Sequence, residues 1–382
     1  MALDARALDL PYLRGQGIGR YTAALLDALG PVSRERGGEL VVLRSGADSP
    51  FAADGAGPQV ETWRVWRPPV PDTLAIACEQ PLLRWDLRRI RAHVLHSSSI
   101  YRAVPAPGLP SVVALHDVIP LLFPGDYMRS GVLYRLMYAT ARRADLLLTV
   151  SESARRDIVA HLNVASESVV VVPGAAHPRF RPTPPDPDLL AGLGITQPYV
   201  LYVGGLAERD PRKGVDELID AFTGWAAADE RPETLVLTGR LGGAAGPLRD
   251  RARRTAGRIV FTGFVPDEKL PALYSGASCL VTCSHYEGFG LPALEALACG
   301  TPVAAYRVGA HEEVVGPGAL LVDDGKTEAL MLAVQVLADH HDLRVRLTDA
   351  GQAHAARFSW RRSAELTWEA YERVAAHRPG VR

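Results

Sequence analysis

The sequence has few cysteines, and their spacing argues against both metal binding and a disulfide framework. Four occur in 382 residues: Cys78, Cys279, Cys283 and Cys299. Their spacing matches neither a zinc motif nor a small disulfide-bonded domain. Cys279 and Cys283 flank the run Leu-Val-Thr, so we expect them to be small buried residues of a strand and its end. A reducing cytoplasm fits this cysteine usage.

Net charge and long apolar runs are also missing. The 42 lysines and arginines nearly balance 43 aspartates and glutamates, giving a net charge of −1 and no reason to expect nucleic acid as a partner. No stretch approaches the ~18 apolar residues of a membrane span. The start, MALDARALDL, carries acids and arginine where a secretory signal would be basic and then apolar. We expect a cytoplasmic protein whose membrane contact, if any, is peripheral at the inner membrane face.

What the sequence does contain is a regular alternation of short apolar runs with helical stretches. Such runs predict buried strands of parallel sheets covered on both faces. Two series flank a proline-rich linker, residues 173–194. The pattern predicts an α/β protein with two doubly wound, Rossmann-like domains, 1–174 and 175–358, that face each other across a cleft. The expected strands are VVLR, HVLHSS, SVVALHD, LLLTVS and SVVVVPG in the first domain, and YVLYVGG, TLVLTG, RIVFTG, SCLVTCS and TPVAAY in the second.

Two glutamates, Glu287 and Glu295, are separated by seven residues in HYEGFGLPALEALACG, residues 285–300. After Pro292 the residues are strong helix formers, and proline suits the first turn of a helix. We therefore expect Glu287 on a loop and Glu295 about one turn into a helix.

The start of that expected helix is a candidate anion site. The N–H groups of Phe289, Gly290 and Leu291 are expected to be free there, glycine lets a ligand approach the backbone, and the helix dipole favours negative charge. With a hydroxyl-seeking carboxylate on either side, the pattern indicates a sugar–diphosphate–ribose ligand. Taken alone, an ordinary turn before a helix would look the same.

A glycine-rich stretch, RGQGIGRYTAALLDAL (14–29), precedes an amphipathic helix. Its glycines, at 15, 17 and 19, form G-x-G-x-G, so the third comes one residue too early for the dinucleotide fingerprint. No acidic residue ends a second strand about 20 positions later, where a ribose would need one. A nicotinamide site is therefore not expected. Either a loop that approaches a ligand in the cleft or a simple tight turn accounts for the pattern.

Two further strand ends carry polar residues. In SVVALHDVIP, His116 follows a buried strand, where imidazole can donate to a sugar hydroxyl or sense charge near neutral pH, or can be an incidental polar neighbour. In YVLYVGGLAERDPRKG, the loop after the strand carries Arg209, Arg212 and Lys213, which suit a phosphate ligand or a solvated basic loop.

Acidic pairs give no convincing metal site. The first, in DPD (186–188), lies in the proline-rich linker, and the second, Asp323 with Asp324, lies in a turn. Both are expected to be solvent-facing turn residues. No metal and no cofactor are assigned.

These motifs together resemble the GT-B retaining glycosyltransferases of family 4, such as bacterial mannosyl- and glucosyltransferases that use nucleotide-sugar donors. The resemblance spans almost the whole chain and follows the family's order. The segments that carry it are GQGIGRYTAALLDAL, VVALHDVIPLLFP, LLLTVSESARRDI, VVVVPGAAHPRF, YVLYVGGLAERDPRKG, FTGFVPDEKLPALYSGAS and EGFGLPALE. The last stretch, within 359–382, resembles the helix that crosses back onto the N-terminal domain.

The resemblance implies roles for individual residues. Arg212 and Lys213, with the N–H groups of residues 289–291, would hold the donor diphosphate, although Arg209 can share the role of Arg212 because this loop is longer than the common form. The other implied donor contacts are Glu295 to the ribose, Glu287 to the sugar hydroxyls, the Val265 backbone to the base, and Gly17 and His116 from the first domain.

The implied reaction moves a sugar, from GDP-mannose or a UDP-sugar, to an acceptor hydroxyl with retention and without a metal. The acceptor would be a small molecule, a glycan or a lipid-linked sugar. The residues do not identify a convincing nucleophile. The resemblance implies same-face attack, with the leaving phosphate taking the acceptor's proton. A nucleotide-sugar epimerase of the same fold and a non-catalytic sugar-nucleotide-binding protein are the alternatives.

Two stretches of the first domain mix arginine with large apolar residues. They are RWDLRRIRAH (84–93) and YRLMYATARRAD (134–145). Either they are ordinary amphipathic helices with solvated arginines, or they rest weakly on anionic lipid and meet a lipid-linked acceptor.

Overall fold

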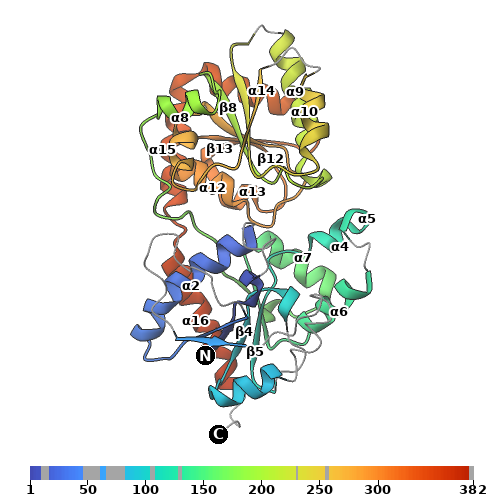
Figure 1. Ribbon diagram of the computed structural model, residues 1–382, viewed down its shortest axis with the longest axis vertical. Helices are drawn as coiled ribbons and strands as arrows, with labels where there is room; N and C mark the ends of the chain where they lie inside the picture. Colours follow the sequence, from blue (N-terminus) through green and yellow to red (C-terminus); the bar gives the residue numbers. More distant parts are fainter. Residues whose placement is uncertain are drawn as a thin grey trace. The chain divides into compact units, whose positions relative to one another are not determined.

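A computed structural model describes residues 1–9, 17–45, 61–65, 82–103, 108–127, 131–228, 231–253 and 258–377, without the side chains of 102 and 131–133. The chain packs as two compact units (Figure 1). The first consists of Met1–Gly174 with Ser359–Arg382, and the second of Ala175–Phe358.

The first unit is built on a seven-stranded sheet in the order β3-β2-β1-β4-β5-β6-β7, and its neighbouring strands pair in parallel. Apart from the edge strands β3 and β7, every residue of the strands is buried, and most are apolar, as strands covered on both faces must be. The strands are β1 (Ala2–Asp4), β2 (Val41–Arg44), β3 (Glu61–Arg64), β4 (Leu95–Ser97), β5 (Ser111–Ala114), β6 (Leu146–Thr149) and β7 (Val169–Val171).

Helices bury the apolar residues of this sheet in two clusters. Residues 82–89 form a helix whose Leu83 and Leu87 pack against strands β1, β2 and β4. A second cluster joins α6 and α7 to β5, β6 and β7. The named helices of this unit are α2 (Gly17–Glu35), α4 (Ile119–Leu122), α5 (Pro124–Tyr127), α6 (Gly131–Ala141), α7 (Glu152–Leu162) and α16 (Trp360–His377).

The last helix, α16, belongs to the first unit although the whole second unit precedes it in the chain. It lies alongside α2 (Figure 1). Its Tyr371 is 1% exposed, and the Tyr371 hydroxyl lies 2.6 Å from Nδ1 of the buried His96 on β4. This buried polar contact ties α16 to the sheet.

The second unit holds a six-stranded sheet in the order β10-β9-β8-β11-β12-β13, also paired in parallel. One cluster of buried residues joins β8, β9, β11 and β12 to α9 and α14, while α12 packs against β11, β12 and α15. The strands are β8 (Tyr199–Val203), β9 (Thr234–Thr238), β10 (Ile259–Gly263), β11 (Cys279–Thr282), β12 (Val303–Tyr306) and β13 (Ala319–Val322). The helices are α8 (Pro187–Gly192), α9 (Val215–Ala228), α10 (Ala245–Arg253), α11 (Leu270–Ser275), α12 (Leu291–Ala298), α13 (His311–Val315), α14 (Thr327–Asp339) and α15 (His341–Ala355).

The predicted α/β fold of two parallel sheets is confirmed, with three additions. Strands β1, β3 and β13 were not among the predicted apolar runs; β3 and β13 lie at the edges of their sheets, and β1 lies between β2 and β4. The interpretation of residues 173–194 as a plain linker is wrong in part. Residues 187–192 form α8, and Phe180 is buried, edge-on to Tyr274. Among the residues described here, no helix is both long and apolar enough to cross a membrane.

The His96–Tyr371 contact predicts a measurable loss on mutation. Tyr371→Phe should lower the free energy of unfolding by about 1–3 kcal/mol, because His96 Nδ1 loses its buried partner. Tyr138→Phe is the matched control, since its buried hydroxyl has no hydrogen-bond partner among the described residues of the same unit. Its change should stay within about 0.5 kcal/mol. Urea unfolding compares the two variants. Equal losses in the free energy of unfolding would contradict a stabilising hydrogen bond between His96 and Tyr371.

Candidate functional site

Parallel strands end at one edge of the sheet, and in the second unit three of these ends meet. Strand β8 leads to the loop that carries Lys213, β11 leads to the loop that carries Glu287 and Gly290, and β12 leads to His311. These four residues line one small cavity of about 40 Å³. The structure thus brings Lys213, Glu287 and the start of α12 together, as the sequence predicted.

Glu287 is an almost buried carboxylate with two cations beside it. Its side chain is 14% exposed, Lys213 Nζ donates to its Oε1 at 2.5 Å, and an Arg212 guanidinium nitrogen lies 3.5 Å from Oε2. Burial alone would raise the pKa of the Glu287 carboxyl, but Lys213 and Arg212 outweigh it and lower the pKa to about 2. Glu287 is therefore ionised at neutral pH, so it can accept hydrogen bonds from hydroxyl groups.

The backbone at Glu287 is held as firmly as its side chain. The N–H of Ala310 donates to the Glu287 carbonyl at 3.0 Å. Gly309 has φ +51°, and a Cβ there would lie 2.2 Å from the Glu287 carbonyl oxygen. Only glycine fits this approach, so the β12–α13 loop fixes where Glu287 stands.

Arg212 is a framework residue of the site. Its side chain is 8% exposed; it donates to the Tyr286 carbonyl at 2.5 Å and to the Asp210 carboxylate at 2.8 Å. The alternative of a solvated basic loop is therefore wrong for Arg212 and for Lys213, which is 23% exposed and paired. The alternative of a solvated side chain does fit Arg209, which is exposed and makes no hydrogen bond or ion pair with the residues that the structure describes.

The helix after Glu287 begins as predicted. Gly290, with φ +94°, is the residue before α12, which starts at Leu291 directly after Phe289 and Gly290. Glu295 lies in this helix, 2% exposed, and accepts a hydrogen bond from the Tyr274 hydroxyl at 3.1 Å. A ribose contact of Glu295, and a base contact of the buried Val265 backbone just after β10, stay predictions.

The two site residues expected from the first unit are described with that unit alone. Gly17 is the exposed first residue of α2, and glycine 15 lies outside the described residues. His116 follows β5, with Nε2 buried and without a partner among the described residues, and its ring lies edge-on to Tyr21 at 4.8 Å. Burial lowers the pKa of His116 to about 4. The expectation that it senses charge near neutral pH is therefore wrong; at pH 7 it is neutral.

Sequence reasoning missed two features near the site. His311 is 1% exposed; its Nδ1–H donates to the Tyr306 carbonyl at 2.7 Å, and burial lowers its pKa, so its Nε2 is left as an acceptor. Its position after β12 was the available signal. Phe264 is 61% exposed beside Val265, with the Arg240 guanidinium 5.3 Å from its ring centre. An exposed phenylalanine cannot be told from a buried one by sequence.

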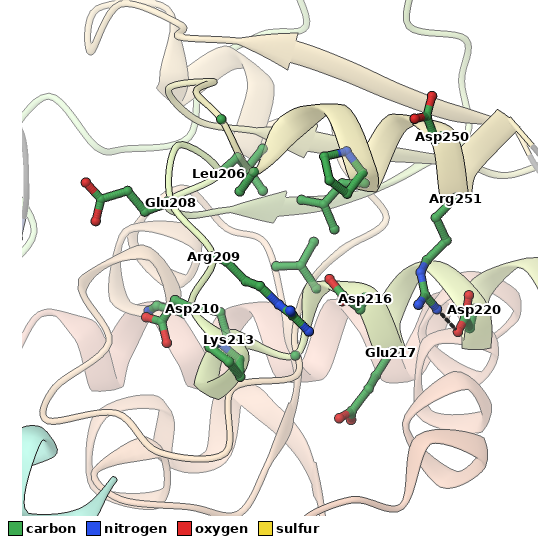
Figure 2. Close-up of a pocket in the computed structure, with 18 residues that line it drawn as sticks. Leu206, Glu208, Arg209, Asp210, Lys213, Asp216, Glu217, Asp220, Asp250 and Arg251 are labelled. Carbon is green, nitrogen blue, oxygen red and sulfur yellow. Dashed lines mark hydrogen bonds and ion pairs between the residues drawn. The ribbon is translucent and has the colours of Figure 1, made fainter. Parts of the chain in front are cut away.

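A larger cavity of about 1160 Å³ lies between the β8–α9 segment and α10 (Figure 2). Arg209 extends into it, while Arg251 pairs with Asp220. Carboxylates outnumber cations along its wall, which disfavours an anion deep inside. Lys213 lines this cavity as well as the small one. The carboxylates are Glu208, Asp210, Asp216, Glu217, Asp220 and Asp250.

Metal ligands do not gather in the described parts of the chain, where no three histidine, cysteine or acidic residues lie close enough to hold an ion. The predicted exposure of the acidic pairs is confirmed: Asp186 and Asp188 are exposed at the start of α8, as are Asp323 and Asp324 after β13. Asp324 is more than a turn residue, since it bonds His285. Cys279 and Cys283 are buried at β11, as predicted; Cys78 lies outside the described residues.

Comparison with known proteins gives this site its context. The model of glycosyltransferase family 4 matches residues 15–179, and that of glycosyl transferases group 1 matches residues 191–354. O-antigen chain mannosyltransferase B of Escherichia coli is 30% identical over 295 residues, 75% of this chain and 76% of that protein. The chain therefore belongs to the family 4, group 1 glycosyltransferases, and it is a glycosyltransferase.

Solved structures agree on the fold. Sucrose-phosphate synthase of Thermosynechococcus elongatus superposes with a TM-score of 0.75 at 22% identity over 99% of both chains. HepE of Anabaena, in complex with UDP and glucose, gives 0.73 at 21% identity over 97% of this chain and 98% of that one. The fold is GT-B.

Three further E. coli relatives, named serotype-specific mannosyltransferase WbdA, are 25 to 27% identical, and this chain spans 34 to 36% of their length.

The close approach of Gly309 to Glu287 predicts a large effect of one methyl group. Gly309→Ala should lower the free energy of unfolding by about 3–5 kcal/mol, because left-handed strain and a backbone clash add. Gly194→Ala is the control: its φ is +71°, but nothing lies within 4 Å of the added Cβ. It should cost only about 1–2 kcal/mol. Equal losses in urea unfolding would show that Gly309 makes no special contact.

Proposed function

We propose that this glycosyltransferase moves a sugar, with retention, from a nucleoside-diphosphate sugar to an acceptor hydroxyl. The observation that carries the proposal is the Lys213–Glu287 pair beside the N-terminus of α12, which joins a cation, a hydroxyl-accepting carboxylate and a helix start in one place. A diphosphate-linked sugar needs these three. The name of mannosyltransferase B and the UDP and glucose bound to HepE support GDP-mannose or a UDP-sugar as the donor.

Each donor group has a proposed partner. The diphosphate would take the N–H groups of residues 289–291 and the Lys213 ammonium. Of the two arginines, Arg209 is the better further partner, because Arg212 is buried and engaged with Asp210 and Tyr286. Glu287 would accept from sugar hydroxyls. The ribose would reach Glu295 only in exchange for its bond with Tyr274.

The base end of the donor has a proposed platform as well. The Val265 backbone would read the base edge, and the exposed ring of Phe264 with Arg240 stands next to it. In the first unit, Gly17 and His116 stay as proposed donor contacts, His116 as a neutral imidazole that bonds a sugar hydroxyl.

The proposed chemistry is same-face substitution at the anomeric carbon. The acceptor oxygen forms a bond to the anomeric carbon while the bond between that carbon and the diphosphate oxygen breaks. The acceptor proton passes to the leaving phosphate oxygen. Lys213 would stabilise the charge on the departing nucleoside diphosphate, which supplies without a metal the role that a divalent cation plays elsewhere. Glu287, ionised and paired with Lys213, cannot serve as the proton donor.

Nucleotide release, measured with and without candidate acceptors, tests the function. A glycosyltransferase releases nucleoside diphosphate fast only when an acceptor hydroxyl is present, and the product keeps the donor's anomeric configuration by NMR. An altered donor sugar without an acceptor would identify an epimerase. Binding without turnover, across a panel of acceptors, would identify a non-catalytic binder.

Lys213 should be essential for turnover. Lys213→Ala should lower kcat by at least about 100-fold, because the leaving diphosphate loses its cation. The fold should persist at neutral pH, since Arg212 still faces Glu287. Lys269→Ala, at an exposed position of the same unit, is the control and should leave kcat unchanged. Near-normal turnover of Lys213→Ala would remove this lysine from the site.

We also propose weak peripheral contact with anionic lipid through residues 84–93, which would bring a lipid-linked acceptor within reach. Trp85 is 55% exposed, Arg89 stacks over it at 4.7 Å, and Arg88 and Arg91 are exposed beside it. An exposed tryptophan among arginines suits the headgroup region of a bilayer.

Vesicle flotation with anionic lipid at low salt tests the membrane contact. The protein should float, and Trp85→Ser with Arg88→Glu should reduce the bound fraction at least about fivefold, since each surface arginine contributes about 1 kcal/mol. Arg253→Glu, exposed in the second unit, is the charge-matched control for Arg88→Glu and should float like the wild type. If the wild type stays at the bottom of the gradient, these are ordinary solvated arginines.

A further inference from the structure

His285 stands between two carboxylates, two residues before Glu287. Its Nδ1 lies 2.6 Å from Asp324 Oδ1, and its Nε2 lies 3.3 Å from Glu217 Oε1. Asp324 belongs to the turn between β13 and α14, and Glu217 to the first turn of α9. Three segments far apart in the chain therefore meet at one imidazole.

Both contacts can be hydrogen bonds only when both ring nitrogens carry a proton. A neutral imidazole has one N–H and one lone pair, so one of the two carboxylates would face a lone pair. Burial alone would lower the pKa of His285, but Asp324 and Glu217 outweigh it, and the pKa lies above its usual value. The geometry and the charges favour the same form, imidazolium.

Other groups around His285 do not offset these carboxylates. From β12, the Tyr306 ring packs against the imidazole, with the ring centres 5.8 Å apart. Glu328 of α14 acts on the Tyr306 hydroxyl as a negative charge, as Glu217 and Asp324 also do, so it adds to the two carboxylates. From its own segment, Cys283 is buried and donates to the carbonyls of Lys213 and Gly214. The loop that carries Arg212 faces the backbone of His285, since the His285 N–H donates to the Arg212 carbonyl at 2.8 Å.

We propose that His285 is a positioning residue whose doubly protonated ring holds the 283–290 loop, and with it Glu287, against α9 and the turn after β13. The link to Glu287 is short. The Tyr286 carbonyl accepts from Arg212, which also faces Glu287, and Lys213 lies two residues before Val215, the first residue of α9. Loss of the His285 proton weakens the grip on one carboxylate and lets the loop move relative to Lys213.

The direction of the pH effect follows from the raised pKa. The stabilisation is fully present below the unfolded-state pKa near 6.5 and is lost as the pH rises through the higher folded-state value. The 283–290 loop should therefore hold the donor better at pH 6 than at pH 9.

The test compares the KM for the nucleotide-sugar donor in wild type and His285→Asn across pH 5.5–9.5. This readout rests on the proposed function. At pH 6 the variant should have a KM about threefold to fivefold higher than wild type with kcat nearly unchanged, because one or two surface ion pairs are lost. At pH 9 the two values should coincide. Glu217→Gln and Asp324→Asn, at half-exposed positions, should each move the midpoint to lower pH. His161→Asn, exposed on α7, should keep the wild-type profile.

A second readout needs no donor. In the ligand-free protein, NMR of the ring protons, with the His285 signal identified by its loss in His285→Asn, should give a midpoint above 6.5 that falls in Glu217→Gln and Asp324→Asn. A midpoint at or below 6.5 in the wild type would overturn the proposal, as would a KM ratio that stays constant with pH. If no nucleotide-sugar is turned over at all, the proposed function fails, while the NMR titration still decides the proposal for His285.

Discussion

The site depends on keeping one carboxylate charged where little water reaches it. Glu287 lies on the loop after the buried strand β11, and a buried carboxyl group left alone would take up a proton. Lys213 and Arg212 prevent this, so the lysine that could hold a ligand's phosphates first neutralises, together with Arg212, a residue of the protein. A diphosphate entering the site would compete with Glu287 for the Lys213 ammonium, and a sugar hydroxyl could take up the hydrogen-bonding capacity of Glu287 that is released.

The surrounding packing fixes the relative positions of Lys213 and Glu287. Gly214 has φ +60° and brings the backbone so close to Cys283 that a Cβ would lie 2.5 Å from the Cys283 carbonyl oxygen, and Gly309 approaches the Glu287 backbone as closely. The thiol of Cys283 and the guanidinium of Arg212 complete the connection between the two loops. The two glycines, Cys283 and Arg212 fix the geometry of the site. Fewer residues than the motif contains therefore take part in the proposed chemistry.

Much of the fold followed from local pattern. Apolar runs such as YVLYV and VAAY are strands because they are buried on both faces, and the helix after Gly290 begins where its helix formers do. Strand β3, with the sequence Glu-Thr-Trp-Arg, carries no such signal because an edge strand can face water. The partners of the site residues were not predictable either. Glu287 and Lys213 are 74 positions apart, and Asp324, which looked like an ordinary turn residue, meets His285 although β12 separates β11 and β13, the strands that precede the two residues.

Hydrogen–deuterium exchange with and without saturating UDP or GDP tests the central claim, that the Lys213–Glu287 pair and the start of α12 form the donor site. Slower exchange across residues 283–295 together with 210–214 is the predicted result, because the diphosphate would bond the N–H groups at the start of α12 and rigidify both loops. Protection confined to residues 205–217 and 243–251 would place the nucleotide in the larger cavity between α9 and α10 and contradict the account.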